Sequence, residues 1–145
     1  MRLMGACLLM LAAFMVTYSE KRRISALSRW LGSFAAAFRR LAREIVATGA
    51  PLARLMDRLS GDIAAFLVPG AALPEEMTEE QRASIEEVRR ILGGYDAKTQ
   101  QEALLRAAVF LEAERAELDK SSPDKIKVHQ AITLSAAAVA IILLL

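Results

Sequence analysis

The side chains that most often perform catalysis or hold metals are scarce in this 145-residue chain. It contains one histidine, His129, and one cysteine, Cys7, far apart in the sequence. A zinc site of the usual kind needs several His or Cys ligands, and a catalytic thiol needs a neighbouring base. The chain also carries no phosphate loop, dinucleotide-binding turn or nucleophile elbow. We therefore predict that the protein is not an enzyme and has no metal site, no cofactor and no catalytic residue.

Two charged clusters remain to be interpreted. Four of the acidic residues gather where a helix is predicted to begin: Glu75, Glu76, Glu79 and Glu80. The helix macrodipole stabilises acidic residues at such a position, and we prefer this interpretation to a cation site. Three basic residues, Arg39, Arg40 and Arg43, lie on another predicted helix with few aromatic neighbours. Nucleic-acid binding is therefore not expected.

The distribution of apolar residues along the chain predicts the helices that carry these charged clusters and the helices that flank them. The chain is 54% hydrophobic and 25% charged, and residues 3–18 and 128–145 contain no acidic, Lys or Arg residue. Sixteen helical residues reach roughly 24 Å at about 1.5 Å per residue, slightly less than the hydrocarbon core, and local thinning can absorb the mismatch. We predict transmembrane helices at residues 3–18 and 128–145, flanking a helical domain at residues 19–127.

The basic residues near the two stretches predict their orientation. A cleavable signal peptide is an alternative for the first stretch, because Arg2 precedes it. However, the basic cluster at residues 21–23 just beyond it is typical of a stop to translocation. Three lysines also precede the second stretch, and no basic residue follows it. The positive-inside rule therefore predicts a cell-membrane protein with both termini on the trans side and the domain in the cytoplasm.

The domain between the two stretches is predicted to be all-α, because it is rich in Ala and Leu and lacks alternating strand patterns. Seven apolar residues recur at spacings of three and four: Ile24, Leu27, Leu31, Phe34, Phe38, Leu41 and Ile45. This repeat predicts a helix that packs on another helix and ends near residues 48–49. We favour an intramolecular bundle. A dimer interface, and hence a homo-oligomer, stays open.

Local signals predict where the later helices begin and end. Pro51 is expected in the first turn of a second helix, whose apolar stripe runs through Leu52, Leu55, Leu59, Ile63 and Phe66. Thr78 and Gln81 form a capping-box pattern that predicts the start of a third helix.

Two glycines, Gly93 and Gly94, should end the third helix in a structural turn, and Asp96 should cap the fourth. The sequence at residues 122–124 resembles a fresh cap followed by a first-turn proline, which predicts a new helix leading into the C-terminal span.

Charge is also sorted along the domain. Residues 20–58 hold nine basic and three acidic residues, and residues 59–96 hold three basic and eight acidic ones. We expect these two segments to attract each other within the fold. Anionic lipid headgroups or charged partners are the alternative, and the cluster at residues 21–23 is the best lipid candidate.

Three stretches of the chain resemble one known family. Residues 41–52 (LAREIVATGAPL) contain an acidic-Ile pair at Glu44 followed at a fixed distance by Pro51 and Leu52. Residues 92–101 (LGGYDAKTQQ) fit a Leu-Gly-x-x-Asp-x-x-x-Gln pattern, and residues 110–145 run into a leucine-rich end. In this order, and with two terminal spans, the chain resembles the stage III sporulation protein AB family of endospore-forming bacteria.

The resemblance implies a function. Members of this family are membrane-anchored scaffold subunits of the secretion-like channel between mother cell and forespore. Their helical domain is similar to the cytoplasmic domain of the type II secretion inner-membrane platform protein. The resemblance implies that the domain docks a secretion-type hexameric ATPase, the stage III sporulation protein AA, and contacts other channel subunits.

Five residues in the matched motifs are the candidates for partner contact: Glu44, Pro51, Leu52, Asp96 and Gln100. The alternative function is a peripheral protein that binds anionic lipids or shapes the bilayer without a motor partner.

Overall fold

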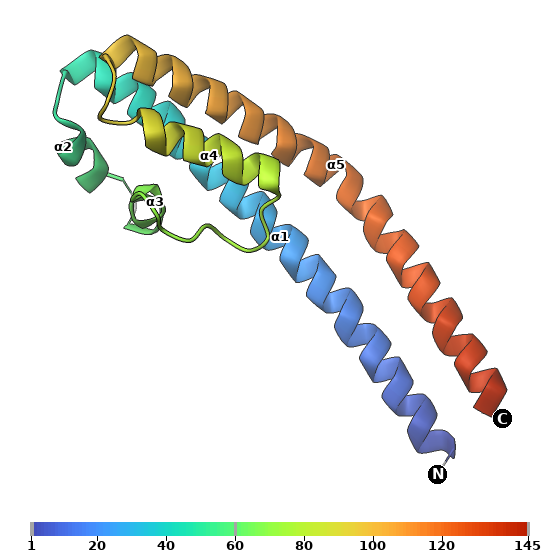
Figure 1. Ribbon diagram of the computed structural model, residues 1–145. Helices are drawn as coiled ribbons and strands as arrows, with labels where there is room; N and C mark the ends of the chain where they lie inside the picture. The colour runs from blue at the N-terminus through green and yellow to red at the C-terminus, as the bar shows by residue number, and fades with distance from the viewer. Residues whose placement is uncertain (1, 60, 145) are drawn as a thin grey trace. The chain divides into compact units, whose positions relative to one another are not determined.

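The computed structural model describes residues 2–59 and 61–144, and the side chains of residues 2, 3, 6, 143 and 144 lie outside this description. The described residues form helices and no strand, so the prediction of an all-α protein is confirmed (Figure 1). The helices are α1 (Arg2–Thr48), α2 (Leu52–Asp57), α3 (Gly61–Leu67), α4 (Glu79–Ile91) and α5 (Ala97–Leu144). Two compact units result: the helical domain, Leu27–Ala116, and the arm unit, Met1–Ala26 with Glu117–Leu145.

The predicted apolar repeat forms the core of the helical domain. Its six members from Leu27 to Ile45 are at most 9% exposed, and Phe34 and Phe38 are fully buried. The other buried core residues come from elements later in the chain, including Leu55, Ile63, Ile85, Val88, Leu104, Ala108 and Leu111. The repeat therefore packs within the chain, because burial of this extent is reached with a single copy.

The stretch after Pro51 departs from the prediction. One continuous helix is expected there, but the structure has two short helices, α2 and α3. Pro51 is the N-cap of α2 rather than a residue of its first turn, with extended backbone angles of φ −58° and ψ 142°. Gly61 begins α3, and a glycine inside a continuous helix would cost about 1 kcal/mol. The break lets each short helix bury its own apolar residues, Leu55 in α2 and Ile63 with Leu67 in α3.

An aromatic cluster fixes α3 against α1. The ring of Phe66 lies 5.1 Å from that of Trp30, at an interplanar angle of 87°, and 5.9 Å from that of Phe34. Edge-to-face pairs of this kind add about 0.5–1.5 kcal/mol beyond the burial of their surface. Trp30 is the chain's only tryptophan, so it reports directly on the position of α3.

Helix α4 begins as its sequence predicts. The Thr78 hydroxyl accepts a hydrogen bond from the Gln81 backbone N–H at 3.3 Å, and the Gln81 side chain accepts one from the Thr78 N–H at 3.1 Å. The capping box is thus confirmed. Gln81 is 3% exposed, and its Nε2 also donates to Glu114 of α5 at 3.0 Å. One residue therefore both caps α4 and ties it to α5.

A buried arginine that the sequence does not reveal holds α3 and the following loop on α4. Arg89 is 6% exposed and forms an ion pair with Glu86. Its Nε donates to the Phe66 carbonyl at 2.8 Å, and its Nη2 donates to the Ala71 carbonyl at 2.9 Å. The carbonyls in the last turn of a helix have no partner within that helix, so Arg89 caps the C-terminal end of α3 from outside.

Among the described residues, two ion pairs of the basic segment are made with residues outside the acidic segment. Arg39 pairs with Glu112 of α5 through two bonds of 2.6 Å, and Arg40 pairs with Glu44 of its own helix. The hydrogen bond from Arg39 lowers the pKa of Glu112 and raises that of Arg39. Both side chains are more than 40% exposed, so solvent screens the pair and its contribution to stability is small.

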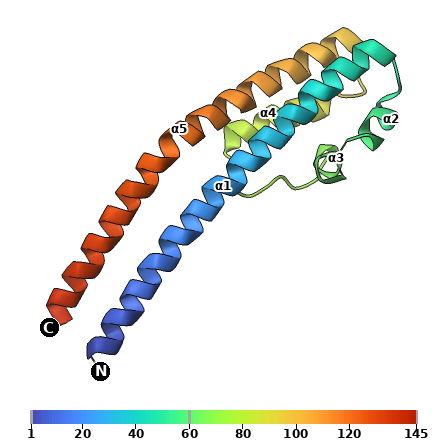
Figure 2. The same ribbon diagram turned by 180° about the vertical axis from the view of Figure 1, so that it is seen from behind.

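The arm unit consists of the first half of α1 and the second half of α5. They lie side by side in both views, with the start of α1 and the end of α5 at the same end of the unit (Figures 1 and 2). Many of their large apolar side chains are exposed, for example Leu8 at 63%, Phe14 at 71%, Ile132 at 63% and Ile142 at 71%. Such contiguous exposed apolar surface is uncommon on soluble monomers.

By length and composition, one helix among the described residues, α5, could cross a membrane over Ala97–Ile142. The predicted N-terminal span, residues 3–18, belongs to α1. The side chains at the start of that span and at the end of the C-terminal one, as well as that of Arg2, lie outside the described residues.

Helix α5 does not restart at residues 122–124, so the predicted fresh cap there is wrong. Pro123 lies inside one continuous helix. Because proline has no N–H, the carbonyl of Asp119 loses its usual helical donor. The Ser122 hydroxyl donates to that same carbonyl at 3.4 Å, which compensates part of the loss.

Candidate partner-binding site

The two internal sequence motifs meet at one end of the helical domain. The end of α1, the start of α2, the turn between α4 and α5 and the start of α5 come together there (Figure 1). They enclose a pocket of about 280 Å³, lined by Ile45, Gly49, Ala50, Leu52, Leu55, Gly93, Ala97 and Gln100. Residues 45–55 and 93–100 thus form a single surface feature, which we call the end pocket.

The end of α1 is shaped by Thr48 and Gly49. The Thr48 hydroxyl donates to the Glu44 carbonyl at 2.7 Å and accepts from the Ala50 N–H at 3.2 Å. Gly49 has φ +56°, a left-handed conformation that L side chains rarely adopt. The helix therefore ends at Thr48, as the sequence predicts, and the chain turns toward α2.

On the opposite wall, Gly93 forms the turn that follows α4. Its φ is +80°, and a Cβ added there would lie 3.3 Å from Cδ2 of Leu52. The backbone angle favours glycine, and any other residue would also have to displace the Leu52 side chain slightly. Gly94 is not among the described residues with positive φ. The predicted structural turn thus depends on the first glycine of the pair.

Asp96 caps α5 as predicted. Its carboxylate accepts from the Thr99 hydroxyl at 2.6 Å and from the Thr99 backbone N–H at 3.1 Å. The side-chain bond from Thr99, followed by the backbone bond, lowers the pKa of Asp96. The charge therefore stays on the carboxylate, close to the positive end of the helix dipole.

Gln100 lies at the pocket and is also used within the turn, since its Nε2 donates to the carbonyl of Tyr95. The Tyr95 side chain is 56% exposed. An exposed aromatic ring beside a pocket is a typical contact for a protein partner. Tyr95 lies within the matched motif at residues 92–101, but the sequence does not predict its exposure, because a single exposed ring produces no periodic pattern.

The predicted contact residues are thus only partly brought together. Leu52 and Gln100 line the end pocket. Pro51 is the N-cap of α2, directly before Leu52, and Asp96 caps α5, four residues before Gln100. Glu44 is not a lining residue. It pairs with Arg40 at 2.9 Å, one turn before the end of α1, with 23% of its side chain exposed.

A second groove, of about 480 Å³, runs between α4 and α5. Its lining includes Glu80, Glu87, Arg106 and Phe110, so charged residues border an apolar floor. This groove could not be predicted from the sequence, because its floor is formed by two helices that are separate in the sequence.

The described residues contain no group of three or more His, Cys, Asp or Glu side chains arranged to hold a metal ion. Two of the clustered glutamates, Glu79 and Glu80, lie in the first turn of α4. What the end pocket and the groove offer is a set of small apolar recesses bordered by polar groups. Such surfaces receive side chains of another protein.

None of the family models, curated proteins or solved structures compared with this chain matches it. Conclusions about function therefore depend on the architecture and on the geometry of these surfaces.

Proposed function

We propose that the protein is a membrane-anchored scaffold subunit that docks a partner through its helical domain. The observation that carries the proposal is the arrangement of α1 and α5: each supplies an apolar arm with exposed side chains and, further along the same helix, part of the buried core of the domain. In water, the exposed apolar surface of two such arms is unfavourable for a soluble monomer, whereas the hydrocarbon core of a bilayer covers it.

The topology we propose has two spans, both termini on the trans side and the helical domain in the cytoplasm. The side-by-side arms with their ends together support it, as does the exposed basic cluster at residues 21–23. Reporter fusions test it. A fusion at either terminus should be active only on the trans side of the membrane, and a cytoplasmic signal from either one would contradict the topology.

By its resemblance to the stage III sporulation protein AB family, the partner we propose is a secretion-type hexameric ATPase, within a channel complex required for endospore formation. The role is non-catalytic. The end pocket supports a docking role, because it joins the two motifs that carry the family resemblance and includes four of their residues, Ile45, Leu52, Gly93 and Gln100.

Co-purification of the full-length protein from membranes with the ATPase tests docking. Glu44→Arg should reduce the recovered ATPase, because it reverses a charge one residue before Ile45, which lines the end pocket, and removes an ion pair with the exposed Arg40. Glu75→Arg is the control: this exposed residue precedes α4, whereas the end pocket lies beyond the C-terminal end of that helix. Equal recovery with both variants would contradict docking at this end of the domain.

A peripheral lipid-binding function is the competing candidate, favoured by the exposed cluster Lys21, Arg22 and Arg23. Extraction of membranes with alkaline carbonate separates the two. A peripheral protein is released, and a protein with membrane-spanning arms is retained.

A further inference from the structure

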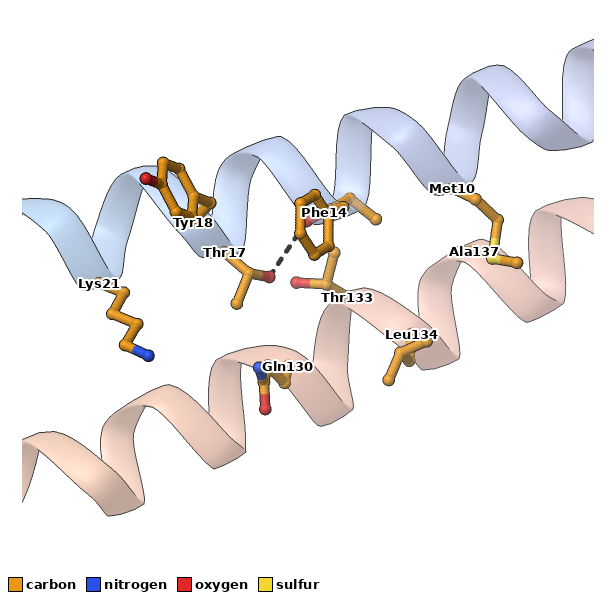
Figure 3. A pocket seen from close by; sticks show the side chains of 10 residues that line it. Met10, Phe14, Thr17, Tyr18, Lys21, Gln130, Thr133, Leu134 and Ala137 are labelled. Carbon is orange, nitrogen blue, oxygen red and sulfur yellow. Dashed lines mark hydrogen bonds between the residues drawn. The ribbon is translucent and has the colours of Figure 1, made fainter.

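A groove runs between the two helices of the arm unit. It has a volume of about 610 Å³ (Figure 3). Its walls include Met10, Phe14 and Tyr18 from α1 and Thr133, Leu134 and Ala137 from α5. Lys21 and Gln130 lie at one end, and Met10 reaches toward Ala137 at the other.

The groove offers few free polar groups, although two threonines line it. The Thr17 hydroxyl donates to the carbonyl of Ala13 at 3.1 Å, the dashed bond in Figure 3. The Thr133 hydroxyl donates likewise to the carbonyl of His129 at 2.7 Å. Both hydroxyls are therefore satisfied by their own helices. The groove offers its occupant mainly hydrocarbon and aromatic contacts.

The length of the groove matches one leaflet of a bilayer. Lys21 and Met10 are eleven positions apart on one helix, which at about 1.5 Å per residue is roughly 16 Å. Half of a hydrocarbon core of about 30 Å is roughly 15 Å. An acyl chain of a phospholipid extends over this same depth when its headgroup is level with Lys21.

The polar end of the groove favours a negative headgroup. Lys21 points across toward the other helix, and Tyr18 stacks on Phe14 with ring centroids 6.5 Å apart. Residues 20–23 are one acidic and three basic residues, so their local net charge is +2. Tyrosine and lysine at this level are typical of the membrane interface, and basic pockets between spans on the cytoplasmic side bind anionic headgroups.

We propose that this groove binds one anionic phospholipid of the cytoplasmic leaflet, with an acyl chain between the arms and the phosphate beside Lys21. The site rests on the proposed membrane insertion of the two arms. It assigns Lys21 a role in headgroup selectivity and Leu134 a role in contacting the acyl chain, and both roles are separate from docking by the helical domain.

Native mass spectrometry of the full chain in detergent, with phosphatidylglycerol or phosphatidylcholine added, tests the proposal. One phosphatidylglycerol should bind preferentially. Lys21→Gln should weaken its binding about fivefold, the effect of one basic residue near an anionic headgroup. Lys127→Gln is the matched control. Lys127 is an exposed basic residue directly before the predicted span at residues 128–145, and it does not line the groove. An equal loss in both variants would show diffuse attraction and overturn the site.

The acyl chain has its own test. Leu134→Trp enlarges an exposed side chain that lines the groove and should reduce binding of both lipids, whereas Val139→Trp alters a similarly exposed residue outside it. Equal binding by the two variants, or occupation of the groove by a second copy seen as a dimer, would overturn the proposal. Alkaline carbonate extraction is run in parallel. Release from membranes would refute membrane insertion itself, whereas retention with no lipid preference would refute the lipid site alone.

Discussion

Arg89 is the residue whose removal should disturb the helical domain most specifically. The substitution Arg89→Met keeps an unbranched side chain of good helix propensity and removes the guanidinium. It leaves the carbonyls of Phe66 and Ala71 without the donor that reaches them in the folded protein. Glu86 loses its partner too, but at 56% exposure its carboxylate is solvated and adds little to the cost.

The size of the effect follows from the two carbonyls. A buried hydrogen bond from a charged donor contributes about 1.5–3 kcal/mol, so the loss of two costs about 3–6 kcal/mol. Small domains have a total stability of about 5–15 kcal/mol. A loss of this size should lower the Tm of a domain of this length by at least about 10 °C.

Trp30 provides the assay, because its ring packs on Phe66 and the chain has no other tryptophan. Thermal unfolding of the full-length protein in detergent, followed by tryptophan fluorescence, should show the lower Tm. The folded variant should also emit at longer wavelength, since α3 is no longer held against Trp30 and water reaches the ring.

Arg90→Met is the matched control, because the neighbouring arginine is exposed. It should leave both the Tm and the emission maximum close to those of the unmodified protein. If Arg89→Met and Arg90→Met behave alike, the inference that Arg89 caps α3 is refuted, and the aromatic cluster alone holds that helix in place.

Three further substitutions test local features of the fold. Hydrogen bonds from the first turn of α5 hold the pKa of Asp96 below its usual 3.8, so the charged carboxylate stabilises the fold at neutral pH and this contribution is lost as the pH falls below that value. Asp96→Asn should therefore lower the Tm at pH 7 and have little effect on the Tm at pH 2. An equal effect at both pH values would contradict the charged cap. Gly93→Ala should cost about 1–2 kcal/mol in the free energy of unfolding, because it places a Cβ at φ +80° and 3.3 Å from the Leu52 side chain. Gly94→Ala should be nearly neutral in the same denaturant titration, and equal costs would be inconsistent with the turn described. Ser122→Ala should lower the free energy of unfolding by up to about 1 kcal/mol, but only while Pro123 is present, because only then does the Asp119 carbonyl lack its helical donor. A double-mutant cycle of Ser122→Ala with Pro123→Ala measures this coupling, and no coupling would argue against compensation by the serine hydroxyl.

Much of the helical domain could be predicted from its sequence because the signals are local. The capping box at Thr78, the charged cap at Asp96 and the left-handed turn at Gly93 each act within a few residues. The apolar repeat at residues 27–45 predicts a buried helix face, since its period matches one side of a helix. For the candidate site, the structure places two residues of the matched motifs, Leu52 and Gln100, in the lining of one pocket, and their contact with a partner stays a prediction.

The remaining features could not be predicted because they depend on contacts between distant segments. Nothing near Arg89 in the sequence identifies the carbonyls of Phe66 and Ala71 as its partners. The break between α2 and α3 depends on how each short helix buries its apolar side chains, and the lack of a break at Pro123 depends on a substitute donor for one carbonyl.

The sequence by itself determined that the protein is helical, where most helices begin and end, and that apolar residues gather at both ends of the chain. These properties follow from the propensities, caps and periodicity of neighbouring residues. Only the tertiary structure decided that the apolar repeat packs inside one chain, that two separate motifs enclose one pocket, and that a groove lies between the arms. Each of these needs the positions of side chains far apart in sequence, which are set by the packing of whole helices rather than by any local preference.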